Sequence, residues 1–333
     1  MAIVAQFGMS KVANERILME SSIDTSPFDD DIIFLSNAHG FNHTTYIPRD
    51  QIAHIYNNAV KGSSESGFFV GMFYLYGFMG TEGGSDMENA IKWFSKSAAD
   101  GFADSQLTLG ILLYHKDRKS SMTWIYQAAV SGNHPRAHYL LARSLCEGSS
   151  LQDIGVKDAI GESKYQQAVS YLRKAGHIPE ALHLLAVLFE YNLVGEEHNG
   201  NDSDAHFKEA LKLYKLAVSN GSVESLYNLA LMYLYGRGTT IDISKATNLL
   251  LQAANKDHVP SFRFLGLLAM QDVDQPNPRD AIFWLRKCVK LAKSADLKTV
   301  CNQDLEQIQE IVENVNSNHY LMHEHNSQKT MNL

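Results

Sequence analysis

The stretch SLYNLALMYLYG, from Ser225 to Gly236, sets a pattern that recurs along the chain. It reads a small residue, three residues, Leu, a Gly or Ala, two residues, an aromatic residue, two residues and Gly. Near the other end, SGFFVGMFYLYG, from Ser66 to Gly77, follows the same order. A sequence motif that occurs twice in one chain is more typical of a structural repeat than of a catalytic site, so further copies are expected.

Fainter copies can each be recognised by the Gly or Ala step that follows the aliphatic residue. These steps lie at residues 71, 110, 142, 186, 230 and 266. A second pattern follows each copy, as in ENAIKWFSKSAADG at 88–101. Residues at i, i+4 and i+8 share one face of a helix. Each copy therefore predicts two antiparallel amphipathic helices that bury their apolar faces by stacking on neighbouring pairs.

This pattern resembles the Sel-one-like repeat family, a variant of the tetratricopeptide helix pair. Residues 224–257, ESLYNLALMYLYGRGTTIDISKATNLLLQAANKD, carry the resemblance most clearly, followed by 66–101, within a span of about 52–292. The resemblance implies an all-α fold, a right-handed α-solenoid of antiparallel helix pairs. It also implies a role as a scaffold or adaptor for other proteins.

The chain divides into four predicted parts. Residues 1–48 form a partly disordered N-terminal segment, and 49–292 form the solenoid, with an orphan helix at 52–62 before about six helix pairs. A capping helix is expected at 293–314 and a disordered tail at 315–333. Ser85 with Glu88 predicts a capping box at the start of the second helix of the first pair. Asn277-Pro278 predicts the start of the second helix of the last pair.

Composition narrows the class of partner and the location. The 333 residues hold 37 Asp and Glu against 29 Lys and Arg, which argues against nucleic acid because phosphate binding needs a basic face. No apolar run reaches the roughly 18–20 residues of a membrane span. Three cysteines without a CxxC predict a reducing environment and no structural zinc. A cytoplasmic location is expected, with mitochondrial import as an alternative suggested by Lys11 and Arg16 and weakened by nearby acids.

Three short segments resemble chemical sites without completing them. MGTEGGSD at 79–86 lacks the Gly-Lys-Ser/Thr of a phosphate loop, so an interhelix turn is expected. The acidic insertion at 194–206 lacks the glycine that a calcium loop needs. The histidines at 39, 43, 319, 323 and 325 have no fixed framework. We therefore predict no catalytic residue, no resident metal, no cofactor and no small-molecule substrate.

Positions beside the Gly or Ala step that helix packing does not require are candidates for binding a protein segment on the concave face. These candidates are Phe69, Gln106, His138, Arg143, His183, Tyr227, Asn228 and Arg263. Phe69 and Tyr227 are equally consistent with a core role. The predicted function is a non-catalytic adaptor or scaffold with a protein or peptide partner. Two alternatives stay open: an organelle or membrane-complex assembly factor, and an enzyme or metal-dependent activity built on the repeats.

Overall fold

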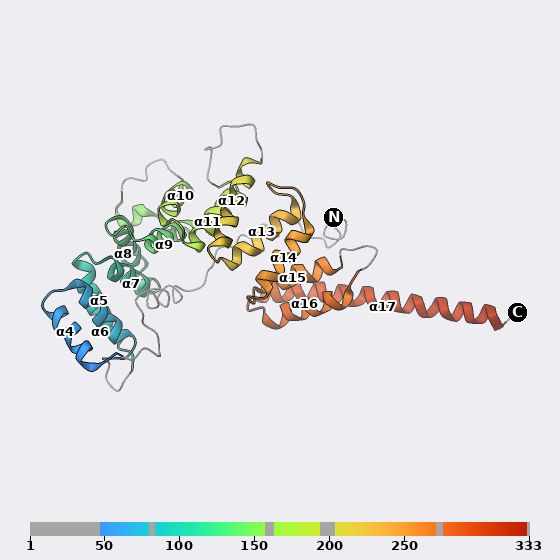
Figure 1. Cartoon of the computed structure of the whole chain (residues 1–333), viewed down its shortest axis with the longest axis horizontal. Helices are drawn as coiled ribbons and strands as arrows, with labels where there is room; N and C mark the ends of the chain where they lie inside the picture. The colour runs from blue at the N-terminus through green and yellow to red at the C-terminus, as the bar shows by residue number, and fades with distance from the viewer. Residues whose placement is uncertain (1–46, 80–83, 157–162, 194–203, 271–275, 332–333) are drawn as a thin grey trace. The chain divides into compact units, whose positions relative to one another are not determined.

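The computed structural model describes residues 47–79, 84–156, 163–193, 204–270 and 276–331, with backbone alone for 315–331 (Figure 1). All regular structure in these residues is helical, which confirms the all-α prediction. They form two compact units. The N-terminal unit holds α4 to α11 and the C-terminal unit holds α12 to α17.

The N-terminal unit begins with the predicted orphan helix, α4 (Arg49–Val60). Helix pairs follow: α5 (Ser64–Leu75) with α6 (Met87–Ala99), α7 (Ala103–Leu113) with α8 (Arg118–Val130), and α9 (Pro135–Cys146) with α10 (Lys164–Ala175), before α11 (Pro179–Glu190). Each helix packs on the next along the chain. The insertion after α9 contains a short 3-10 helix, η2 (Leu151–Ile154), which packs on α8.

The C-terminal unit contains α12 (Ala205–Ser219), α13 (Val223–Tyr235), α14 (Ile243–Ala254), α15 (Val259–Ala269), α16 (Pro278–Leu291) and α17 (Ala295–Met331). Helix α17 packs on α15 and α16, with Ile308 fully buried in a core shared with Leu285. The sequence predicted that this helix ends at residue 314 and that a disordered tail follows. Instead α17 is helical to Met331, and residues 315–331 contain no Gly or Pro to end it.

Small residues at the repeat step are explained by the closeness of paired helices. A Cβ atom added to Gly71 would lie 2.6 Å from the ring of Phe94 on α6, and one added to Gly110 would lie 2.7 Å from Ile125 on α8. Gly266 is equally close to Leu285 on α16. The step therefore marks the line along which the first helix of a pair touches the second.

The glycine that closes the pattern ends the first helix with a left-handed residue. Gly77, Gly148 and Gly236 have φ values of 78°, 99° and 67°, a conformation that costs glycine least. In the fourth repeat the equivalent position is Asn192, with φ 53°. Asparagine tolerates this conformation better than most residues, so it takes the place of glycine.

One helix start was predicted correctly and one was displaced by a residue. Asn277 caps α16 by accepting the backbone N–H of Asp280, with Pro278 in the first turn as expected. The predicted capping box at Ser85 and Glu88 was wrong. The cap of α6 is Asp86, whose carboxylate accepts the backbone N–H of Asn89 at 3.0 Å.

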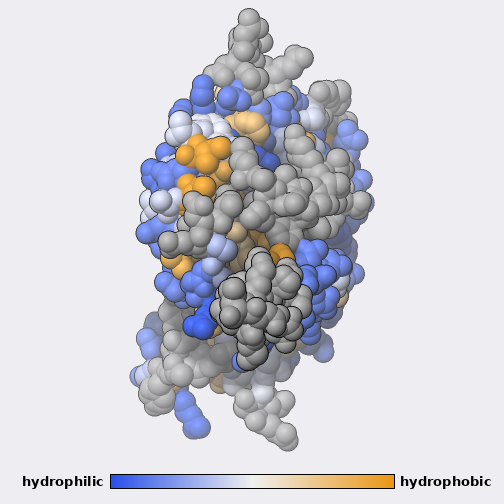
Figure 2. Space-filling view, turned by 90° about the vertical axis from the view of Figure 1, so that its right-hand side faces the viewer, coloured by the Kyte–Doolittle hydropathy of each residue, from blue (hydrophilic) through white to orange (hydrophobic). Residues whose placement is uncertain are grey.

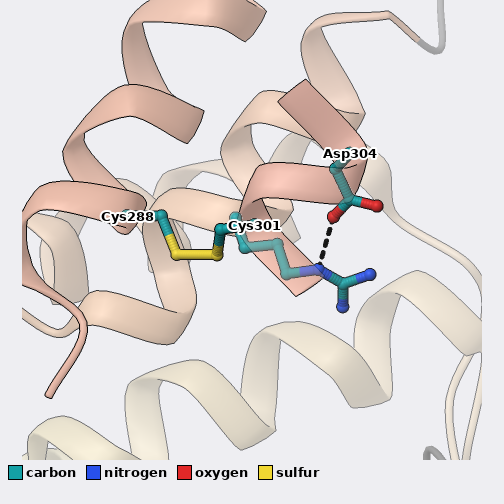
Figure 3. The surroundings of a disulfide bond; sticks show 4 residues. Cys288, Cys301 and Asp304 are labelled. Atoms are coloured by element: carbon teal, nitrogen blue, oxygen red, sulfur yellow. Dashed lines mark hydrogen bonds and ion pairs between the residues drawn. A yellow bond between two sulfur atoms is a disulfide. The ribbon is translucent and has the colours of Figure 1, made fainter. Parts of the chain in front are cut away.

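The sequence predicted no disulfide bond, and the structure contradicts this for two of the three cysteines. Cys288 on α16 and Cys301 on α17 form a disulfide, and both are fully buried (Figure 3). They are separated by 13 positions in sequence, and α16 and α17 pack closely enough to bring them together. Cys146 is a buried free thiol, as expected of a small core residue. The bond ties the last helix to the repeat before it.

Candidate binding surface on the first helices

The first helices of the repeats are α5, α7, α9, α11, α13 and α15, and all of them except α11 turn one side toward the second helix of their own pair. Gly71, Gly110 and Gly266 mark that side. A residue two positions away is rotated by about 200° around the helix axis and lies on the opposite side. We call the set of positions two before and two after each step the inner face. It consists of Phe69, Phe73, Thr108, Leu112, Leu140, Ser144, Leu184, Leu188, Asn228, Met232, Phe264 and Leu268.

The inner face of the N-terminal unit is buried most deeply at α9 and α11. Leu140 and Ser144 have no exposed surface, and Leu188 has 1%. Phe69 on α5 and Leu112 on α7 are partly exposed. The whole of α9 after its first proline is buried, on every side. The centre of the inner face is therefore shielded from solvent, while its edge is accessible.

Two arginines flank one tyrosine on α9. The guanidinium carbons of Arg136 and Arg143 lie 5.0 and 5.9 Å from the centre of the Tyr139 ring. Arg136 Nη1 is 3.0 Å from Glu180 Oε1 of α11, and Arg143 Nε is 3.5 Å from Glu147 Oε1. Buried guanidinium groups stacked on an aromatic ring are well suited to hold carboxylates in a fixed direction.

A second polar group closes the C-terminal end of α9. The hydroxyl of Tyr114, next to α7, donates a 2.7 Å hydrogen bond to Glu147 Oε2. Burial, followed by the hydrogen bond and charge of Glu147, raises the pKa of Tyr114 to about 12. Arg118 of α8 lies 3.5 Å from the same carboxylate and donates to Ser149 at 3.0 Å. Glu147 thus holds α7, α8 and α9 together through three side chains.

Two histidines hold the other end of α9. His134 Nδ1 accepts the backbone N–H of Arg136 at 3.1 Å, and its Nε2 lies 3.1 Å from Asp104 Oδ1 of α7. His138 Nε2 lies 3.1 Å from Asn133 Oδ1, and its ring stacks on Tyr171 of α10. Burial, helped by Lys174 and His134, lowers the pKa of His138. His138 is therefore neutral near pH 7.

Several buried polar atoms around α7 and α9 have hydrogen-bonding capacity left over. Gln106 Oε1, Thr108 Oγ1, His138 Nδ1 and Ser144 Oγ find no hydrogen-bond partner among the residues that the structure describes. Thr108 and Ser144 are inner-face residues. Buried hydroxyls without partners are uncommon in folded proteins, and each can still donate to or accept from a backbone that lies across it.

The predicted binding residues of the N-terminal unit are all helical, and only one of them lies on the inner face. That residue is Phe69, which is half-buried beside Phe68. Gln106 faces α6, donating to the carbonyl of Ala98 at 3.1 Å. His138 faces α10, Arg143 lies on the Tyr139 stack, and His183 is buried on α11.

In the C-terminal unit, Asn228 is the predicted residue on the inner face, and it donates to the hydroxyl of Tyr214 at 3.2 Å. Tyr227 packs against the rings of His258 and Phe264. Arg263 Nε donates to Asp304 Oδ2 of α17 at 2.6 Å, beside the disulfide (Figure 3). The binding role of all eight residues stays a prediction. Sequence reasoning overlooked Arg136 and Tyr139, which the i, i+3, i+7 spacing with Arg143 signals.

The remaining predicted segments fall mainly outside the described residues. These are half of MGTEGGSD, residues 194–203 of the acidic insertion, and the histidines at 39 and 43. Of the histidines at 319, 323 and 325 only the backbone is described. Within the described ranges, no group of three or more His, Cys, Asp or Glu side chains is placed to hold a metal ion. None of the helices there is both long enough and apolar enough to cross a bilayer. Among the residues coloured in Figure 2, most are hydrophilic, with small hydrophobic areas between them.

Comparison with protein families finds a match to the Sel1 repeat at residues 64–102, 135–177, 179–222, 223–258 and 264–289. The matched ranges cover more than half of the chain and leave out α7 and α8, the pair with the shortest connection. The chain is also similar to the crystal structure of a Sel1 repeat protein from Oxalobacter formigenes, with a TM-score of 0.56 and 21% identity, over 73% of this chain and 99% of that one. This likeness supports the solenoid fold.

Curated relatives match over part of their length. Protein SHC1 of Saccharomyces cerevisiae is 29% identical over 151 residues, which are 44% of this chain and 26% of the relative. The chitin synthase regulator SKT5 of the same yeast is 27% identical over 187 residues, which are 52% of this chain and 25% of the relative. The chain spans about a quarter of the length of these two relatives.

Proposed function

The chain belongs to the Sel1 repeat family, and from this premise we propose that it is a non-catalytic adaptor or scaffold. In this proposal the inner face of the first helices holds an extended segment of a partner protein. The observation that carries it is the inner face itself. Within each unit, apolar and polar side chains occupy this face on successive first helices, as an extended ligand requires.

The partly exposed apolar residues of the inner face support a protein ligand. Phe69 and Leu112 in the N-terminal unit, and Phe264 and Leu268 in the C-terminal unit, provide apolar area. Aromatic residues are enriched at protein interfaces. The polar groups that surround the face are held in ion pairs and caps, an arrangement that suits recognition better than proton transfer. A cytoplasmic location, and the alternative of organelle assembly, remain predictions from the sequence.

A second candidate function follows from the similarity to a chitin synthase regulator. Here the chain would bind an enzyme and regulate it, without catalysing a reaction itself. The two candidates share the same surface and differ in what the partner does. Identification of the partner separates them, because the second requires that its activity changes when the chain binds.

The experiment compares partners captured in native cells by the wild-type chain and by two inner-face variants, Phe69→Ala and Phe264→Ala. Both residues are partly exposed, so the variants remain close to the native fold. Phe283→Ala is the matched control, because Phe283 is 53% exposed on α16, a second helix. We expect at least one partner to be lost from an inner-face variant and kept by the control. Partners that depend on Phe283 alone would refute the proposal.

A further inference from the structure

A second surface lies on α16, away from the first helices. We propose that the outward face of α16 docks on a membrane by binding the anionic headgroups of a phospholipid bilayer. This outward face consists of Arg279, Phe283, Arg286 and Lys290. The inner face of the first helices takes no part in it, so the inference goes beyond the proposed function and does not depend on it.

Helix α16 has one buried side and one charged side. Its buried residues form a single line along the helix: Ala281, Leu285 and Cys288. Since successive residues are rotated by about 100°, Phe283 and Lys290 lie almost directly opposite this line. Arg279 and Arg286 flank them, and all four residues are exposed. With a rise of about 1.5 Å per residue, the row from 279 to 290 is about 16 Å long and runs along the helix axis.

The cations of the outward face have no acidic partner among the residues that the structure describes. On α6, α12 and α14 an exposed lysine pairs with an acid within one helical turn. Arg279, Arg286 and Lys290 make no such pair within the described ranges. The acid of α16, Asp280, instead accepts a 2.8 Å hydrogen bond from the side chain of Asn277 at the start of the helix. The three positive charges are therefore available to an external anion.

Positive charge is concentrated here although the chain as a whole is acidic. Residues 279–298 hold six Lys and Arg against two Asp, a net charge of +4, whereas the whole chain has a formal charge of −8. An anionic surface attracts the basic segment and repels the rest of the chain. The charge distribution therefore favours one orientation of α16 on such a surface.

Phe283 adds an apolar contact in the middle of the row. It is 53% exposed, more than any other aromatic side chain in the described ranges. Its ring lies 5.0 Å from that of Trp284, and the ammonium of Lys287 is 5.7 and 5.6 Å from the centres of the two rings. An exposed aromatic ring among cations is typical of helices that lie at the boundary between headgroups and acyl chains.

A bilayer fits the outward face better than an acidic protein segment does. Peptides are bound in grooves or at sheet edges, where they are contacted from more than one side. The neighbours of α16 meet it on its buried side, α15 at Leu285 and α17 at Cys288. The outward face is thus a single row on one helix, which matches a flat surface that the helix lies against.

The test is sedimentation of the full chain with phospholipid vesicles. We expect the wild type to bind vesicles of equal parts phosphatidylserine and phosphatidylcholine, and not vesicles of phosphatidylcholine alone. A cation near an anionic bilayer changes the affinity by about fivefold. The variant Arg279→Gln/Arg286→Gln/Lys290→Gln should therefore bind at least about twentyfold more weakly than the wild type.

The control is Lys212→Gln/Lys215→Gln/Lys256→Gln, which removes the same charge from exposed sites of the same unit and should bind as the wild type. No binding of the wild type to the phosphatidylserine vesicles, or equal weakening in both triple variants, would overturn the proposal. Binding of the wild type to poly-glutamate and to neither kind of vesicle would assign the outward face to an acidic protein segment and overturn it as well.

Trp284, next to Phe283, reports whether this face meets the bilayer. In a Trp93→Phe/Trp124→Phe background it is the single tryptophan of the chain. Phosphatidylserine vesicles should shift its emission to shorter wavelength, and lipids brominated on the acyl chains should quench it. Binding without either change would show that another surface docks, which contradicts the proposal. The inner-face variant Phe69→Ala should bind vesicles as the wild type, so this proposal and the proposed function fail separately.

Discussion

Two glycines one turn apart on α5 allow the repeat packing to be tested with the same substitution. A Cβ atom on Gly71 would lie 2.6, 2.7 and 2.9 Å from three atoms of the Phe94 ring, which is fully buried. A Cβ atom on Gly67 would lie 3.4 Å from Ser97 Cβ, an ordinary van der Waals distance. Both glycines face α6, and only Gly71 occupies the step of the repeat.

The magnitudes follow from two opposing effects. Alanine favours the helix over glycine by about 0.8–1.0 kcal/mol, and this gain is the same at both positions. At Gly71 the rigid ring of Phe94 has to move, and overpacking of this kind costs about 1–3 kcal/mol. We therefore expect Gly67→Ala to stabilise the N-terminal unit by about 1 kcal/mol. Gly71→Ala should be less stable than Gly67→Ala by about 1–3 kcal/mol.

Urea unfolding followed by tryptophan fluorescence measures this difference. The chain has three tryptophans, and Trp284 lies in the C-terminal unit. In a Trp284→Phe background the remaining two, Trp93 and Trp124, both report on the N-terminal unit. If Gly71→Ala proves as stable as Gly67→Ala, the close crossing of α5 and α6 at the repeat step is wrong.

Three further predictions concern the cysteines and a histidine. Reduction of the Cys288–Cys301 bond, which spans 13 positions, should destabilise the C-terminal unit by about 3 kcal/mol. The urea midpoint followed by Trp284 fluorescence should fall accordingly. An unchanged midpoint would contradict the bond. Burial raises the pKa of the Cys146 thiol to about 12, so a thiol reagent at pH 8 should find no reactive cysteine in the native, unreduced chain and one after unfolding. More than one in the unfolded chain would show that the disulfide is absent. The lowered pKa of His138 means that, as pH falls below about 6.5, the unfolded chain binds the proton more readily and the N-terminal unit loses stability. His138→Gln should flatten this dependence between pH 7.5 and 5.5, and an unchanged slope would exclude His138 as its source.

The repeat could be predicted from sequence because its spacing reflects a physical constraint. Helices that cross at Gly71, Gly110 and Gly266 have no room for a larger side chain, so the small residue recurs. The same reasoning found the start of α16 at Asn277-Pro278. At α6 the predicted cap was one residue too early, because Ser85 and Asp86 are both good N-cap residues and sequence alone does not choose between neighbours.

Contacts between distant residues could not be predicted in this way. Cys288 and Cys301 belong to no spacing motif, and only the packing of α17 on α16 brings them together. The exposure of the candidate binding residues depends on contacts with side chains that are distant in sequence. Helical periodicity shows which residues share a face of one helix, and it does not show these contacts. Arg263 illustrates this, because its partner Asp304 lies 41 positions away on α17.

The central claim is that the inner face of the first helices binds a protein segment. The most direct measurement places a photoreactive amino acid at position 69, on the inner face, or at position 283, on a second helix, and irradiates native cells. We expect crosslinks to a partner protein from position 69 and none to that partner from position 283. Crosslinks to a partner from position 283 with none from position 69 would contradict the account.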